Sequence, residues 1–250
     1  MNNIFKYVEK DGQIMITGLQ EGVTTASIAI PETIDNMPVT VIAYQAFKES
    51  SITSIKIGGN IRAIDAGAFE DCQSLTSVIW NDHCKTIPYR CFSRCVSLST
   101  FDFSGVESIG KWAFEGSGLQ EVNLPRNIQK VGDFAFSSCK SLKAFRWNAQ
   151  TQNIPQRCFV NCASLSTFDF SSVESIHEGA FAGSGLQEAN LFHNIQKVEP
   201  FAFQDCKSLV KIEWLSDESI NIYTFANCEN LKAVNISDQV QNIEANAFQG

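Results

Sequence analysis

The chain has 250 residues, of which 44% are hydrophobic, and a formal net charge of -8. This length and apolar content are enough for a substantial buried core, whereas the acidic balance argues against a nucleic acid or an anionic membrane as the main partner. No stretch approaches the roughly 20 apolar residues of a membrane helix, so no membrane insertion is expected.

The first forty residues differ from the rest and are expected to form an N-terminal cap, residues 1–40. The segment FKYVEKDGQIMITG contains two apolar-patterned runs joined at Asp11-Gly12, a dipeptide typical of a tight hairpin turn. A cap is useful where a repeat array would otherwise expose sheet edge and core. The N-terminus has no basic start followed by a long apolar run, so no signal peptide is visible.

From residue 41 to 250 the sequence repeats with a period of about 22–23 residues, a length typical of stacked repeat units. Each unit is marked by a Phe that usually follows Ala or Cys. These residues are Phe47, Phe69, Phe92, Phe114, Phe136, Phe159, Phe181, Phe203, Phe225 and Phe248. A pattern L-x-x-h-x-h follows, with h apolar, and this alternation predicts a short strand with one buried face.

About ten such units are expected to stack into a right-handed leucine-rich repeat solenoid, because one unit cannot bury its own apolar stripe. The fold would have a parallel β-sheet on its concave face, with turns and short irregular or helical segments behind. The array stops in mid-unit at NAFQG, so we expect the chain to be truncated at its C-terminus, or another surface to cover Phe248.

The units also form a larger repeat that spans three of them. STFDFSGVESI at 99–109 returns as STFDFSSVESI at 166–176, and residues 97–142 match residues 164–209 at 34 of 46 positions. Tandem duplication of a three-unit block explains this, since each unit needs only neighbours. Tryptophans at the same offset replace inward apolar residues, so a core position is predicted for them. They are Trp80, Trp147 and Trp214.

The repeated words I-x-x-x-A-F-x-x-C-x-x-L-x-x-h-x-h, from Val41 to the end, resemble the BspA-type leucine-rich repeat family. The N-terminal DGQIMITG and IPETIDNMPVTVI also look like the opening of such domains. The resemblance implies a curved solenoid for protein binding. It also implies a place on a cell surface or outside the cell, and for some members adhesion to host matrix proteins. It supplies no catalytic motif.

The nine cysteines follow the repeat. Six stand three residues after the repeat Phe, where other units have Ser, which predicts a small and buried slot; they are Cys72, Cys95, Cys139, Cys162, Cys206 and Cys228. Reduced core thiols are expected, because side chains on neighbouring coils lie too far apart and too parallel for a disulfide. Cys84 falls in a turn and is expected to be the most reactive thiol.

No enzyme, cofactor or metal is predicted. His83, Cys84, Cys91 and Cys95 have ligand types that suit zinc, but the duplicated block repeats two of them without the others. The three histidines come with no nucleophile that the sequence can place beside them, and no phosphate loop is present.

The outward-facing strand positions are the first candidate binding surface. Their centre is mainly acidic, and the candidate partner-binding residues are Asp102, Glu121, Arg146, Asp169, Glu188 and Glu213. Two interpretations stay open, an ordinary solvated face and a surface that attracts a basic patch on a partner.

A second candidate patch is aromatic. Trp112 and Phe134 each stand two residues before a repeat Phe, on adjacent coils, in a slot that holds Arg or Gly in other units. Such a slot faces solvent, where the two rings can stack. Aromatic pairs anchor many interfaces; the alternative is lateral packing that shields the loop backbone.

The sequence therefore predicts a non-catalytic protein-binding solenoid, whose partner by family resemblance is a host extracellular matrix protein. Because no signal peptide is visible, an intracellular protein-interaction scaffold in the cytoplasm is the alternative. Finding a leader and an anchor in the full gene would separate the two.

Overall fold

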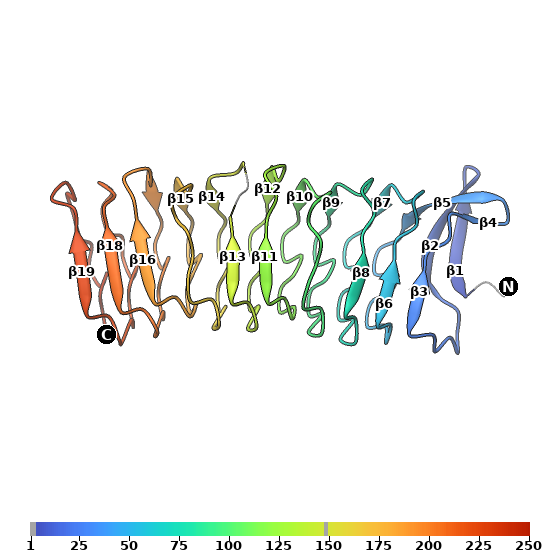
Figure 1. The fold of residues 1–250 in the computed structure, drawn as a ribbon, viewed down its shortest axis with the longest axis horizontal. Coiled ribbons are helices and arrows are strands. Elements are labelled where there is room, and N and C mark those ends of the chain that lie inside the picture. The colour runs from blue at the N-terminus through green and yellow to red at the C-terminus, as the bar shows by residue number, and fades with distance from the viewer. Residues whose placement is uncertain (1–3, 148–149) are drawn as a thin grey trace.

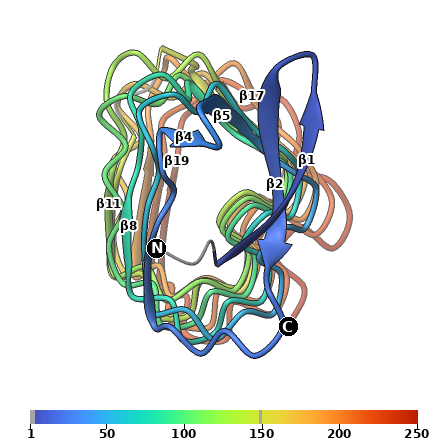
Figure 2. The same cartoon turned by 90° about the vertical axis from the view of Figure 1, so that its right-hand side faces the viewer.

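A computed structural model of the chain describes residues 4–147 and 150–250. The chain coils into an elongated solenoid with its two ends at opposite extremes (Figure 1). Seen down the long axis, each coil has three sides (Figure 2). We call them the front sheet, the back sheet and the turn side, which carries the residues around each repeat Phe. The described residues form strands and turns and no helix, so the expected solenoid is confirmed, and its backing segments are not helical.

The front sheet is built from one short strand in each unit except two, and its strands pair in parallel in three groups, β3-β6-β8, β11-β13 and β16-β18-β19. Its strands are β3 (Ser27–Ala29), β6 (Ser54–Lys56), β8 (Ser77–Ile79), β11 (Glu121–Asn123), β13 (Ala144–Arg146), β16 (Glu188–Leu191), β18 (Lys211–Trp214) and β19 (Ala233–Ile236). The pairing keeps equivalent residues side by side, as in Glu188 opposite Lys211 and Asn190 opposite Glu213. The predicted parallel sheet and its inward–outward register are thus confirmed.

The front sheet is interrupted at both copies of the duplicated phrase. Residues 99–103 and 166–170 are described, yet neither segment forms a strand, so the strand predicted for LSTFDF is wrong. The Oδ1 atoms of Asp102 and Asp169 accept hydrogen bonds from the backbone N–H groups of Ser104 and Ser171, each at 2.9 Å. An aspartate that bonds its own backbone two residues on turns the chain, and here this turn replaces the ladder.

The back sheet is formed by the I-x-x-I/V segment of each unit. Its two-residue strands are β7 (Ala63–Ile64), β9 (Thr86–Ile87), β10 (Ser108–Ile109), β12 (Lys130–Val131), β14 (Asn153–Ile154), β15 (Ser175–Ile176) and β17 (Lys197–Val198). They pair in parallel in three groups, and a bridge from Ile220 to Ile243 continues the pattern. Such short strands hold because each coil also bonds its neighbours on the other sides.

The predicted N-terminal hairpin forms. β1 (Phe5–Lys10) pairs antiparallel with β2 (Gln13–Leu19), and the turn residues Asp11 and Gly12 have φ angles of 52° and 71°, as a two-residue hairpin turn requires. β2 then pairs in parallel with β5 (Met37–Ile42), which also carries the antiparallel β4 (Thr33–Ile34) and joins the back sheet through β7. The domain boundary at residue 40 stays a prediction.

The core runs along the whole axis as a column of stacked rings. The ten repeat phenylalanines lie one above another, with neighbouring ring centroids 5.2–6.0 Å apart. Phe5 packs edge-on against Phe47 at the first coil, with centroids 6.4 Å apart. Trp147 and Trp214 are buried, as expected, and Trp80 is partly buried. Each Trp indole N–H donates to the backbone carbonyl four residues on, which satisfies its polar atom inside the core.

The cysteine slot makes a second ladder. All nine cysteines are buried free thiols, so the prediction of buried core thiols is confirmed. The six in the repeat slot each donate to the carbonyl of the repeat Phe on the preceding coil, at 3.0–3.3 Å. Ser117 and Ser184 contact the next thiol at 3.4 Å. The slot therefore needs a small side chain that can donate, which explains why it accepts both Cys and Ser.

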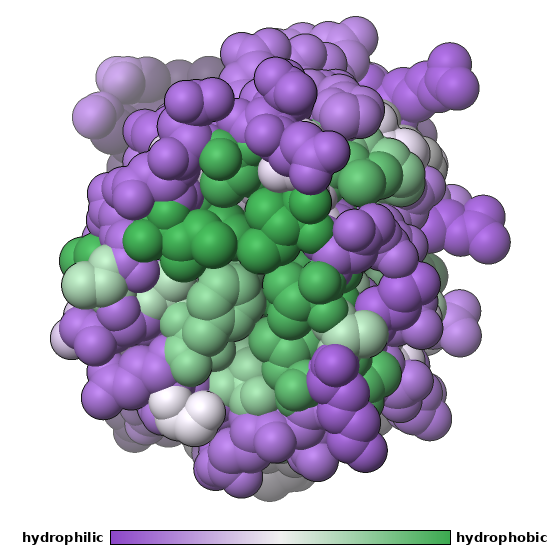
Figure 3. Space-filling model, turned by 90° about the vertical axis from the view of Figure 1, so that its left-hand side faces the viewer, coloured by the Kyte–Doolittle hydropathy of each residue, from purple (hydrophilic) through white to green (hydrophobic). Residues whose placement is uncertain are grey.

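The end of the solenoid that carries β19 shows an apolar face (Figure 3). Val234 and Ile243 are 42% and 49% exposed there, and Phe248 is only partly buried against the core.

Candidate functional site

The front face presents the predicted charged row. Asp102, Glu121, Arg146, Asp169 and Glu188 are exposed, and each has an inward-facing neighbour in the chain. They lie on β11, β13, β16 and the two turned segments of the duplicated phrase, so the row follows the front side across several coils. A binding surface must be exposed, but an ordinary solvated face is exposed as well. Exposure alone therefore does not distinguish the two interpretations.

Glu213, the sixth charged candidate, is less free than the others. Its carboxylate is paired with the Lys211 ammonium at 2.9 Å and accepts a hydrogen bond from the Asn235 amide at 2.7 Å. The hydrogen bonds from Lys211 and Asn235 lower the pKa of the Glu213 carboxyl. Because Lys211 already neutralises its charge, Glu213 should attract a basic group of a partner less strongly than Glu121 or Glu188 does.

Three of the charged candidates meet around one hollow on the front face. Where the ladder opens beside β11, a groove of about 890 Å³ lies between residues 100–104 and strands β11 and β13. Asp102, Glu121 and Arg146 line it, and they are joined by two residues that the sequence did not single out, Phe101 and Arg126. The groove thus combines carboxylates, guanidinium groups and a partly buried ring, the mixture that protein interfaces commonly use.

The aromatic pair lies on the turn side, away from the groove. The ring centroids of Trp112 and Phe134 are 5.2 Å apart with planes inclined by 33°, so the two rings are in contact as expected, in a tilted arrangement. Both rings are half-buried. The Lys111 ammonium lies 4.5 Å from the centroid of the Trp112 ring, and the Arg90 guanidinium carbon lies 5.1 Å from it. At these distances the negative face of the ring attracts the cation.

The backbone of this slot is unusual. Trp112 and Phe134 have φ angles of 55° and 57°, in the left-handed region that bulky residues rarely occupy. The same slot is left-handed in every unit, whether it holds Arg90, Gly179 or Phe201. The repeat geometry therefore imposes the conformation, and a glycine at this slot is free of backbone strain.

The cysteines, which the sequence offered as reactive or metal-binding groups, all lie in the core. Cys84 is only 3% exposed, and burial raises the pKa of its thiol to about 11, against a partial opposing effect of Arg62. Cys84 is therefore a poor nucleophile, because the exposed thiolate is the reactive form. That it is the most reactive of the nine thiols stays a prediction. Residues 4–147 and 150–250 contain no cluster of three His, Cys, Asp or Glu side chains able to hold a metal ion.

The repeat signature identifies the family. The model of the BspA type leucine rich repeat region matches residues 40–166, 103–210 and 152–250, with six copies. The chain belongs to the BspA-type leucine-rich repeat family. Leucine-rich repeats of this family are generally a binding fold without a catalytic role.

Solved structures of bacterial leucine-rich repeat proteins share the fold. One from Bacteroides ovatus has a TM-score of 0.67 at 23% identity, and the match covers 97% of this chain and 78% of the Bacteroides chain. The T. pallidum leucine rich repeat protein has a TM-score of 0.65 at 24% identity, covering 82% and 88%. One from Eubacterium ventriosum has a TM-score of 0.58 at 18% identity, covering 99% and 80%. At these identities the likeness concerns the fold alone.

No curated protein sequence matches the chain closely enough to count as a relative. Among the described residues, no helix is long and apolar enough to cross a bilayer.

Proposed function

We propose that this BspA-type solenoid is a non-catalytic protein-binding module that acts at a cell surface or after secretion and adheres to a host or extracellular matrix protein. The observation that supports it best is the groove beside β11, where the opened ladder gathers Asp102, Glu121 and Arg146 around a partly buried ring. A long, rigid array of coils can present such a surface without conformational change, and this limits the entropic cost of binding.

The electrostatics favour a partner that carries basic side chains. The chain has a net charge of -8, and Glu121 and Glu188 stand exposed at equivalent places in the two duplicated blocks. Opposite charges across an interface accelerate encounter and select the partner. Because exposed charges are screened by salt, binding should weaken as ionic strength rises.

The test is binding of the purified chain to immobilised matrix proteins, with the double variant Glu121→Lys/Glu188→Lys. The matched control is Glu107→Lys/Glu174→Lys, which makes the same charge change at equivalent places of the two duplicated blocks, but beside the back-sheet strands β10 and β15. Saturable, salt-sensitive binding that only the first variant loses supports the proposal. Absence of binding across the panel contradicts adhesion and favours the intracellular scaffold.

A further inference from the structure

The left-handed slot builds a column of stacked side chains along the turn side. Arg90, Trp112, Phe134 and Arg157 follow one another on successive coils: the Arg90 guanidinium carbon lies 5.1 Å from the Trp112 ring, and the Arg157 guanidinium carbon 5.8 Å from the Phe134 ring. Further along, Phe201 stacks on Tyr223 with centroids 5.4 Å apart and planes 6° from parallel. Between Arg157 and Phe201, the slot is occupied by Gly179. Between Arg90 and Tyr223 the column therefore lacks one side chain. The slot also holds glycine at Gly67, where the Gln45 and Glu70 side chains lie 3.1 and 3.4 Å from where a Cβ would be.

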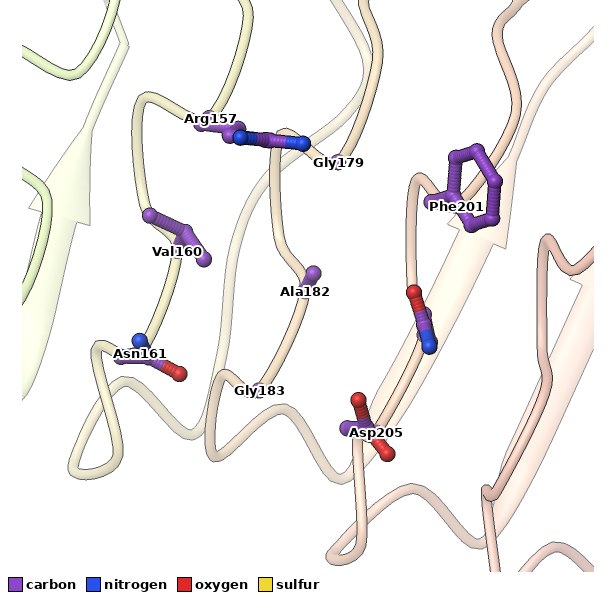
Figure 4. Close-up of a pocket in the computed structure, with 9 residues that line it drawn as sticks. Arg157, Val160, Asn161, Gly179, Ala182, Gly183, Phe201 and Asp205 are labelled. Carbon is purple, nitrogen blue, oxygen red and sulfur yellow. The ribbon is translucent and has the colours of Figure 1, made fainter.

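The missing side chain leaves a hollow of about 290 Å³. Figure 4 shows the coil of Gly179 and Gly183 lying between the coil that carries Arg157 and the coil that carries Phe201. Asn161 and Asp205 lie at the other end of the hollow, away from Arg157 and Phe201. A cavity of about 150 Å³ is large enough to hold benzene, so this hollow has room for one aromatic ring.

The duplicated block shows what fits in such a hollow. Alignment of the two copies relates Arg157 to Arg90, Phe201 to Phe134, and Gly179 to Trp112. In the first block, the Trp112 indole occupies the space between the guanidinium and the Phe ring, 5.1 Å from one and 5.2 Å from the other. The second block keeps both walls and removes the ring between them.

The distance between the walls also suits a ring. Neighbouring coils of a parallel ladder are about 4.8 Å apart, so Arg157 and Phe201, two coils apart, leave about 10 Å for one inserted layer. Each contact would then be about 5 Å long, the spacing observed on either side of Trp112. Arg157 is held in place because its guanidinium donates to the Glu178 carboxylate at 3.1 Å. Its Cγ would lie 3.2 Å from a Cβ at Gly179, so the flexible Arg157 side chain must move by a few tenths of an ångström when a side chain is added there.

We propose that the Gly179 hollow is a docking site for an aromatic side chain of a polypeptide partner, seated between Arg157 and Phe201 as Trp112 is seated in the first block. A ring there gains a cation–π contact on one face and an aromatic contact on the other. Asn161 and Asp205 supply acceptors for an indole N–H or a phenol O–H at the far end. This inference rests on the proposed function as a protein-binding module, and it adds the anchor that the partner uses.

The first experiment uses 5-fluoroindole as the probe and follows its ¹⁹F NMR signal on titration with the full chain. We expect saturable binding, with a dissociation constant on the order of 1 mM for so small a ligand. Gly179→Trp fills the hollow and should weaken binding by about tenfold or more. Its backbone is compatible with the change, since Trp112 adopts the same left-handed conformation. Phe201→Ala removes a wall and should weaken binding in the same way without adding bulk.

The reciprocal variant Trp112→Gly sharpens the test. It creates the same hollow in the first block, so the bound stoichiometry of 5-fluoroindole should rise from one to two (about twofold). Tyr44→Ala removes an exposed ring from a coil far from the hollow, so it serves as the control and should leave binding unchanged. Failure of the wild-type chain to bind the probe, or binding by Gly179→Trp and Phe201→Ala as tight as that of the wild type, overturns the proposal.

The polypeptide source is tested with basic peptides that carry one Trp, against matched peptides with Leu in its place. Preference for the Trp peptide that Gly179→Trp abolishes supports the proposal, whereas binding of 5-fluoroindole without that preference overturns the assignment to a polypeptide. The proposed function and the docking site are tested separately. The Glu121→Lys/Glu188→Lys variant changes only the front face, whereas Gly179 lies on the turn side.

Discussion

The stacked Phe column should carry much of the stability, and Phe136→Ala tests this most directly. Phe136 is fully buried at the middle of the array, with the Phe114 and Phe159 rings 5.6 and 6.0 Å away on either side and the Phe145 ring edge-on at 4.9 Å. Truncating such a residue removes its transfer free energy and leaves a cavity, at a cost of about 3–5 kcal/mol. For a chain of this size each kcal/mol lowers Tm by roughly 2–4 °C, so a fall of about 10 °C is expected.

Position along the array provides the control. In a solenoid each unit contacts only its neighbours, and Phe248, at the last described coil, is partly exposed and stacks on Phe225 alone among the described rings. Phe248→Ala should therefore cost about 1–2 kcal/mol. Urea unfolding followed by circular dichroism measures both. The predicted role of the column would be refuted if both variants lost the same free energy of unfolding, or if Phe136→Ala lost less than about 1 kcal/mol. Either result would show that neighbouring rings in the column do not stabilise one another.

Three further predictions concern single interactions. The double variant Asp102→Ala/Asp169→Ala should lower the free energy of unfolding by about 1 kcal/mol per site. The control Asp102→Asn/Asp169→Asn keeps the Oδ1 acceptors and should match the wild type in thermal melts. An equal loss of stability in the Ala and the Asn variants would show that the hydrogen bonds to Oδ1 do not stabilise the turns. Glu70→Gln should cost about 1–3 kcal/mol, because its buried carboxylate is paired with Lys48 and Arg90, each at 3.3 Å; urea unfolding unchanged from the wild type would show that the pairs contribute nothing. Burial raises the pKa of the Cys139 thiol to about 12, whereas a thiol in the unfolded chain has a pKa of about 8.5. The folded state therefore keeps a proton that the unfolded state releases, so the free energy of unfolding should be constant below about pH 8 and fall by up to about 1.4 kcal/mol per pH unit and thiol above about pH 9; a stability that rises with pH in that window would contradict the buried ladder.

Periodicity predicts this fold well because each repeat position has the same surroundings in every unit. The Phe column, the buried cysteine slot and the outward row all follow from the repeat period. The interruption at 99–103 does not follow from it, since LSTFDF has the same alternation as the strands that pair. A local hydrogen bond from Ser104 N–H to Asp102 decides that segment, and a pattern of apolar residues carries no information on such competition.

The candidate surfaces were predicted in part. The sequence placed the charged row and the Trp112–Phe134 stack, but not the groove that Phe101 and Arg126 help to form, because a groove depends on where coils separate. The hollow at Gly179 had a visible signal, the replacement of Trp112 by glycine at the equivalent position of the duplicated block. That replacement alone does not predict a hollow, because the hollow also depends on the cations and rings of the neighbouring coils.

The central claim, that a protein partner binds the front face, is tested most directly by carboxylate footprinting. The chain alone and the chain bound to its matrix protein are labelled with carbodiimide and glycine ethyl ester, and the labelled sites are read by mass spectrometry. The account predicts that Glu121 and Glu188 are protected in the complex while Glu107 and Glu174 keep their labelling. Protection of Glu107 and Glu174, with Glu121 and Glu188 still labelled, would place the partner on another side of the solenoid and contradict the claim.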